Sequence, residues 1–418
     1  MRICDRRLLD RRPIDDDRER LAAVAAVIAA VRLNGDAALR EYTERFDRVR
    51  LHDFHVAAPE RALELVDQEI LAALRAAARR LEAFHRRQPA ASWVTAELGG
   101  LMGQMVTPLD RVGCYVPGGT APLPSTVLHT VILARVAGVR EIVVATPPNP
   151  DFPDTGYVNP VILAATAIAG ATEVLCLGGA QAIAAMAYGT QTIRPVDKIV
   201  GPGNIYVTLA KKEVYGVVGV DGIAGPTEIM VVADGRARAD FVAADLASQM
   251  EHDPMAWAVL VTDSAALADA VEEEFTGLSA RLDRAEVVAA AHLAVILADN
   301  LEQAFQVVND FAPEHLEIVA EDPARWLPLV ENAGAVFLGD YAAVTLGDYV
   351  IGPNHTLPTS GSARFSSPLG VYSFLKRTSV ASVTRGDLHG LQEAARTLAR
   401  MEGLTAHANA VEVRLRDD

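Results

Sequence analysis

The feature that most constrains this chain is a long alternation of strand-like and helix-like segments between residues 111 and 338. Short apolar runs rich in valine, isoleucine and leucine are each followed by a longer segment with apolar residues at helical spacing. Strands that alternate with helices form parallel sheets covered by those helices. The pattern predicts an α/β fold with two sheets, because the units fall into two successive series.

In the first series the predicted strands are 112–116, 141–145, 173–177 and 198–200, and the predicted helices are 125–137, 159–169, 180–188 and one after residue 204. In the second, the predicted strands are 229–233, 258–261, 294–297, 316–319 and 335–338, and the predicted helices are 239–251, 264–275, 301–311 and one near 326–332. Residues 18–33 and 59–87 predict two earlier helices, and a C-terminal extension begins near residue 368.

Composition excludes several classes of protein. The 418 residues carry a formal net charge of −16, so phosphate backbones and anionic lipid surfaces are poor partners. Cys4, Cys114 and Cys176 are too widely and irregularly spaced for a disulfide framework or a thiolate metal cluster. No secretory signal and no apolar stretch of membrane-spanning length is visible, so we expect a cytoplasmic enzyme without nucleic-acid or membrane partners.

Three glycine turns follow predicted strands of the first series. They are 116–119 (VPGG), 177–181 (LGGAQ) and 201–204 (GPGN). Free backbone N–H groups at such strand–helix junctions can bind phosphate. None matches G-x-G-x-x-G, and a single one is commonly only a tight turn. Three in one α/β domain favour a nucleotide cofactor without identifying it.

Several polar residues could form a metal and proton-transfer site. Gln249 and His252 share a helix face, Glu314 and His315 follow a helix, and His407 lies near the C-terminus. Asp348 and His355 bracket a loop rich in glycine and proline. Each alone is more typical of a polar face, a solvated loop or a turn. Together they offer imidazole, carboxylate and amide donors for zinc, or nearly as well manganese.

The order and spacing of several motifs resemble the histidinol dehydrogenase family. They are YVPGGTAPLPSTVL, GGAQAIAAMAYGT, VGPGNIYVT, AGPTEI, SQMEHDP, APEHLEI, GDYVIGPNHTLPT, GVYSFLKRTS and EGLTAHANAVEVR, with LLDRRP and NGDAALREYTERFD near the start. This resemblance covers essentially the whole chain. It implies oxidation of L-histidinol through L-histidinal to L-histidine, with two NAD⁺ reduced, as the end of histidine biosynthesis.

The resemblance also implies site residues, position by position. The implied zinc ligands, one ion per subunit, are Gln249, His252, Asp348 and His407, and Glu314 and His315 are the implied proton-transfer pair. Substrate contacts are implied for Thr227, Gln249, His252, His315, Asp348, His355, Glu402 and His407. The implied NAD contacts are Tyr115, Gln181 and Asn204, one on each glycine turn. A homodimer is implied, in which Glu402 and His407 reach the site of the other subunit.

We therefore predict two incomplete Rossmann-like domains with parallel sheets, an N-terminal helical arm and a C-terminal tail. The expected boundaries are 1–20 for the arm, 21–110 with 228–367 for the metal and catalytic domain, 111–227 for the NAD domain and 368–418 for the dimerisation tail.

Some features leave alternatives open. Thr227 stands where the family more often has serine, and Met250, Val350 and Ile351 are bulkier than its usual residues. A related zinc and NAD dehydrogenase for another small diol or amino alcohol is therefore one alternative, and a metallohydrolase or a binding protein is another. Cys114 could form a thiohemiacetal with an aldehyde, although a small buried residue is the more typical role at a strand end.

Overall fold

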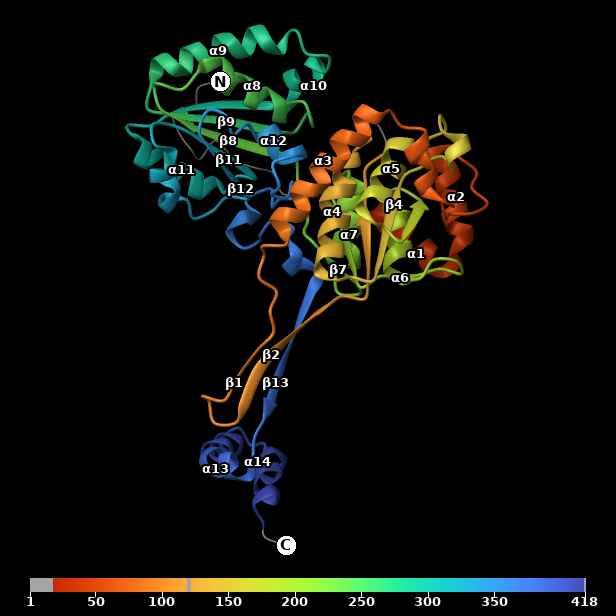
Figure 1. Ribbon diagram of the computed structural model, residues 1–418, viewed down its shortest axis with the longest axis vertical. Helices are drawn as coiled ribbons and strands as arrows, with labels where there is room; N and C mark the ends of the chain where they lie inside the picture. Colours follow the sequence, from red (N-terminus) through yellow and green to blue (C-terminus); the bar gives the residue numbers. More distant parts are fainter. Residues whose placement is uncertain (1–17, 119–121, 417–418) are drawn as a thin grey trace. The chain divides into compact units, whose positions relative to one another are not determined.

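The computed structural model describes residues 18–118 and 122–416, and the chain divides into two compact units. We call the residues up to Gln88 together with Leu109–Phe374 the main unit, and Pro89–Pro108 together with Leu375–Asp418 the tail unit. Figure 1 shows both units, with labels on most of their helices and strands. The predicted N-terminal arm, residues 1–20, lies almost wholly outside the described residues, as do Cys4 and Gly119.

The first sheet of the main unit has five parallel strands in the order β5-β4-β3-β6-β7. Every residue of β3 is buried, as expected for a sheet covered on both faces. The strand order reverses between β3 and β6, and such a reversal leaves a crevice at the carboxyl ends of the strands. The strands are β3 (Arg111–Tyr115), β4 (Glu141–Thr146), β5 (Glu173–Cys176), β6 (Lys198–Val200) and β7 (Gly219–Val220); the following helices are α4 (Pro124–Ala137), α5 (Pro160–Ala169), α6 (Gly179–Tyr188) and α7 (Ile205–Val214).

The N-terminal helices share the hydrophobic core of this first sheet. They are α1 (Arg18–Asn34), α2 (Asp36–Asp47) and α3 (Gln68–His85). Val27, Leu39 and Leu81 on these helices belong to one buried cluster with the β3 and β4 side chains. This packing differs from the predicted grouping of 21–110 with 228–367. The apolar helix faces were recognisable in the sequence, but their partner surface was not.

Two predicted helices are wrong in extent. Instead of one helix over 59–87, a 3₁₀ helix spans Pro59–Glu64 and α3 begins separately at Gln68, with Asp67 before it. The helix predicted near 326–332 is the 3₁₀ segment Pro323–Leu329, which contains Pro328. Proline lacks the N–H that an α-helix needs in its interior. Helix α2 was not predicted.

The second sheet is also parallel, with the order β10-β9-β8-β11-β12. Alternate residues of β8 pack into separate cores: Ile229 and Val231 on one face, Met230 and Val232 on the other. The prediction of two parallel α/β sheets is confirmed. The strands are β8 (Glu228–Ala233), β9 (Trp257–Thr262), β10 (His292–Leu297), β11 (His315–Val319) and β12 (Ala335–Leu338); the helices are α8 (Ala239–Met250), α9 (Ala265–Ser279), α10 (Ala285–Ala290), α11 (Leu301–Phe311) and α12 (Val344–Tyr349).

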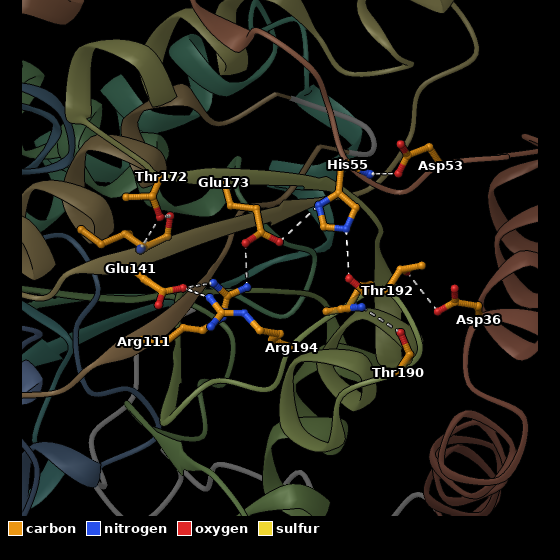
Figure 2. A network of polar contacts seen from close by, with 12 residues as sticks. Asp36, Asp53, His55, Arg111, Glu141, Thr172, Glu173, Thr190, Thr192 and Arg194 are labelled. Atoms are coloured by element: carbon orange, nitrogen blue, oxygen red, sulfur yellow. Dashed lines mark hydrogen bonds and ion pairs between the residues drawn. The ribbon is translucent and has the colours of Figure 1, made fainter.

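An ion cluster ties together the amino ends of the first-sheet strands (Figure 2). Arg111, the first residue of β3, donates to Glu141 at 2.6 Å and to Glu173 at 2.7 Å, and these carboxylates begin β4 and β5. Arg194 also pairs with Glu141, and His55 Nδ1 lies 3.3 Å from Glu173. The predicted cofactor turns follow the carboxyl ends of the same strands, at the opposite edge of the sheet. We therefore assign the cluster a structural role.

The tail unit is a three-stranded antiparallel sheet in the order β1-β2-β13 with two helices. The strands are β1 (Trp93–Thr95), β2 (Leu101–Pro108) and β13 (Leu375–Ser382), and the helices are α13 (Arg385–Met401) and α14 (Thr405–Glu412). Helix α13 buries none of its residues in the single chain, and Leu391, Leu398 and Met401 form an exposed apolar face. Among the described residues, no helix is long and apolar enough to cross a membrane.

Candidate active site

The predicted proton-transfer pair lies at the amino end of β11, beside the amino end of the neighbouring parallel strand β8. Glu314 is 7% exposed. Its Oε2 accepts hydrogen bonds from the Thr227 hydroxyl at 2.6 Å and from the Glu228 backbone N–H at 3.0 Å. Burial raises the pKa of Glu314 to about 8, although these two donors oppose the increase. The carboxyl group is thus placed to exchange a proton near neutral pH.

His315 is held in one orientation by the same pair of strands. It is 3% exposed, and its Nδ1–H donates to the Glu228 carbonyl at 3.0 Å. In the neutral ring this bond leaves the lone pair on Nε2, which lies 3.9 Å from Asp348 Oδ1. Burial lowers the pKa of His315, opposed by Asp348. The ring is therefore a neutral base with one free nitrogen.

Three of the four predicted metal ligands belong to the main unit and surround this pair. Gln249 is 1% exposed near the end of α8, and its Oε1 lies 2.9 Å from the Thr227 hydroxyl oxygen. His252 follows α8, and burial lowers its pKa, with His315 contributing. Asp348 is on α12, and burial raises its pKa although His315 and Gln249 lower it. Over the described ranges no three His, Cys, Asp or Glu side chains group around a metal position.

The fourth predicted ligand, His407, is on α14 of the tail unit, and Glu402 directly follows α13 there. Both side chains are exposed.

His355 lies in the loop after α12 and faces the first sheet's helices. Its Nδ1–H donates to the backbone carbonyl of Asp348 at 3.0 Å, and its ring stacks on His129 of α4. Burial lowers the pKa of His355 to about 4. The loop thus returns His355 to the backbone of Asp348, the other residue that brackets it in the sequence.

The three predicted NAD contacts line one pocket of about 960 Å³ at the carboxyl ends of the first sheet. The Tyr115 hydroxyl accepts the Gly179 N–H at 3.1 Å, and Asn204 Oδ1 caps α7. Gln181 Oε1 is buried and has no hydrogen-bond partner among the described residues. Such an unpaired buried oxygen is available to a ligand donor. His252 and Arg284 line the same pocket, which therefore extends to one of the predicted metal ligands.

The glycine turn after β6, whose last residue Asn204 lines this pocket, requires glycine at its first position. Gly201 has φ +108°, and a Cβ there would clash with the backbone carbonyl of Tyr115. Only glycine combines this conformation with so close an approach of two strands.

Sequence reasoning missed the contribution of α2 to the pocket. Arg45, Phe46 and Asp47 line its wall, and Gln181 Nε2 lies 3.5 Å from Asp47 Oδ2. Burial raises the pKa of Asp47 to about 6. The signal was present in NGDAALREYTERFD, which ends at Asp47 but carried no assigned role. The thiohemiacetal alternative for Cys114 has no support, because the thiol is fully buried and its pKa is raised to about 12.

Comparison with known proteins gives a consistent result. The family model described as histidinol dehydrogenase matches residues 10–415. The chain is 51% identical to histidinol dehydrogenase of Moorella thermoacetica, over 95% of each chain, and 52% identical to that of Geobacillus kaustophilus, over 95% and 94%. The crystal structure of histidinol dehydrogenase from Elizabethkingia anophelis, 35% identical, superposes with a TM-score of 0.93 over 98% of this chain and 95% of that one. The chain therefore belongs to the histidinol dehydrogenase family.

Proposed function

We propose that this protein oxidises L-histidinol through L-histidinal to L-histidine, with one water consumed and two NAD⁺ reduced. The observation that carries the proposal is the buried Glu314–His315 pair, which adjoins His252 at the end of the pocket lined by Tyr115, Gln181 and Asn204. NAD⁺ bound in that pocket would supply the hydride acceptor. The relatives' names do not favour the alternatives of another amino alcohol or of a hydrolytic reaction.

His315 is the base of the alcohol step. Its Nδ1–H is held by the Glu228 carbonyl, so Nε2 carries the lone pair that takes the hydroxyl proton as hydride leaves the carbinol carbon. The lowered pKa keeps the ring neutral before the reaction. This tautomer leaves Nε2 as the nitrogen that can act as the base.

Glu314 is the base of the aldehyde step. Its carboxylate takes a proton from the water that adds to the histidinal carbonyl, and the resulting hydrate can lose its second hydride. The Thr227 hydroxyl and the Glu228 N–H stabilise the ionised carboxylate in a buried position. Burial keeps its pKa high enough for the carboxylate to accept that proton.

We further propose that a zinc ion is held by Gln249, His252 and Asp348 of one chain and by His407 of a second copy of the chain. The donor set fits zinc, because it offers imidazole and oxygen ligands. Burial lowers the pKa of His252, and the neutral imidazole is the form that binds a metal. Rotating the Gln249 carboxamide by 180° would let its nitrogen donate to Thr227 and leave its oxygen for the metal. Zinc bound there would orient the amino and imidazole nitrogens of the substrate.

The tail unit supports a homodimer. The exposed apolar face of α13 and the exposed Trp93, Val94 and Met105 on the strands are unusual for a small unit in water. A second copy that covers these side chains would also let His407 of one chain complete the proposed ligand set of the other. Two-fold pairing is the commonest way in which identical chains associate.

The activity is tested by adding L-histidinol and NAD⁺ to the purified zinc-loaded protein and following absorbance at 340 nm. We expect two NADH for each histidinol consumed, with L-histidine as the product by chromatography. One NADH per substrate would contradict the two-step reaction, and absence of NADH would contradict the activity.

The shared site is tested with two inactive variants, Asp348→Ala and His407→Ala, unfolded together in equal amounts and refolded with zinc. Random pairing makes half of the dimers mixed, and each mixed dimer has one intact site of two. Activity should therefore approach about a quarter of that of refolded wild type. If His407 serves its own chain, every site carries a lesion and no activity returns.

A further inference from the structure

A second histidine, His129, contacts the loop that carries His355. His129 lies in the middle of α4 and is 1% exposed. Its Nδ1 accepts the backbone N–H of His355 at 3.1 Å, and its own carbonyl accepts Asn354 Nδ2 at 2.6 Å. The two imidazole rings stack at a centroid distance of 3.9 Å and an interplanar angle of 12°. One helix residue thus contacts the loop by two hydrogen bonds and a ring face.

These contacts determine the tautomers of both rings. His129 Nδ1 accepts a backbone N–H, so it must carry a lone pair, and the proton of the neutral ring is on Nε2. His355 Nδ1–H donates to the Asp348 carbonyl, so the lone pair of His355 is on Nε2. That nitrogen lies 3.4 Å from the Thr126 hydroxyl, a long contact that a substrate N–H can replace. His355 is thereby an oriented acceptor.

The loop depends on such side-chain contacts because it has no regular backbone ladder of its own. Residues 350–358 form bends and turns, and helix α3 also contacts them, through Arg80, which donates to the Ile351 carbonyl at 3.2 Å. The side of the loop near His355 is held by α4. A helix of the first sheet therefore positions a residue of the second sheet's site.

We propose that His129 is a positioning residue for substrate recognition, which fixes the orientation and tautomer of His355 through its Nδ1 acceptor and its ring face. The inference rests on the proposed function, in which His355 contacts histidinol. A proton relay through His129 does not fit the geometry, because stacked rings present no N–H to each other and Nδ1 is already occupied by a backbone donor.

The test separates the acceptor from the ring. His129→Phe keeps an aromatic face but leaves the buried N–H of His355 without an acceptor, and His129→Leu removes both contacts. His129→Asn keeps a short side-chain oxygen that can accept that N–H. Thr130→Val is the matched control, because the Thr130 hydroxyl donates within α4 to the Thr126 carbonyl and does not contact the loop.

We expect the KM for L-histidinol, and its Kd by calorimetry without NAD⁺, to rise about tenfold in His129→Phe and at least as much in His129→Leu. His129→Asn should restore affinity to within about threefold of wild type. The KM for NAD⁺ and the bound zinc should be unchanged, and Thr130→Val should bind histidinol as wild type does. An unchanged Kd in folded His129→Phe and His129→Leu would overturn the proposal.

A double-mutant cycle distinguishes positioning from general damage to the core. If His129 acts through His355, then His129→Phe adds no loss of histidinol affinity to His355→Ala. Losses that multiply would overturn the positioning role. Normal affinity in His355→Ala would overturn it as well, while NADH production by the wild-type protein would still support the proposed function.

Discussion

The hydroxyl of Thr227 joins two site residues and has only one hydrogen to donate. It lies 2.6 Å from Glu314 Oε2 and 2.9 Å from Gln249 Oε1. The shorter contact, to the more basic oxygen, is the one that a charge-assisted hydrogen bond favours. Thr227→Val has nearly the same shape without the hydroxyl, so it should change the ionisation of Glu314 without opening a cavity.

The size of the change follows from the hydrogen bond that is lost. A hydrogen bond to a charged acceptor contributes about 1.5–3 kcal/mol, and about 1.4 kcal/mol corresponds to one pKa unit. Burial already raises the pKa of Glu314 to about 8, with the Thr227 bond opposing the increase. Removing that bond should therefore raise the pKa by roughly one to two units. On the acid side, where the rate follows the ionised fraction, histidinal oxidation should fall about 10- to 100-fold.

The assay is kcat/KM for L-histidinal, measured from NADH absorbance over a range of pH with zinc present. The rate requires ionised Glu314, so it rises as pH increases, and its acid limb should move to higher pH in Thr227→Val. Bound zinc would shift the acid limbs of wild type and of Thr227→Val to lower pH by the same amount, so the difference between the two profiles would remain. Thr227→Ser keeps the hydroxyl and should follow the wild-type profile. A loss in Thr227→Val that is equal at every pH would refute the reasoning, provided that zinc content and melting temperature match wild type.

Further predictions concern the bases, the metal, the cofactor pocket and the ion cluster. His315→Asn should lower kcat for histidinol by about 10²-fold or more, and Glu314→Gln should slow histidinal oxidation more than histidinol oxidation in single-turnover experiments; equal mild effects would contradict the assigned roles. Chelation should remove zinc and activity in parallel, with recovery on adding Zn²⁺ or Mn²⁺, and full turnover of protein shown metal-free by elemental analysis would contradict the site. Burial raises the pKa of Asp47 to about 6, so its carboxylate forms as pH rises through that value. If this carboxylate accepts hydrogen bonds from cofactor hydroxyls, the KM for NAD⁺ should fall over this pH range in wild type and stay constant in Asp47→Asn. Arg111→Met removes the shared partner of Glu141 and Glu173, and unfolding in urea should show a loss of about 3 kcal/mol with little change in KM; a loss below about 1 kcal/mol would mean that the cluster is not stabilising.

Local pattern was sufficient for most of the main-unit elements. The strands 112–116 and 229–233 and the helices after them are visible in sequence because burial on both faces and helical periodicity are properties of neighbouring residues. The predicted helix boundaries were wrong where the apolar spacing continues across a break in the helix, as it does after the 3₁₀ segment Pro59–Glu64. The pairing of β2 with β13 could not be predicted, because its two strands come from distant parts of the chain.

The sequence by itself determined the family and predicted the site residues, because both are carried by motifs such as APEHLEI and SQMEHDP. Only the tertiary structure decided how these residues are tuned. It brought Thr227 to Glu314, joined the N-terminal helices and Asp47 to the first sheet, and placed His129 against His355. Desolvation, tautomer and hydrogen-bond partner depend on atoms from segments far apart in the chain, so a linear pattern names a residue but does not set its environment.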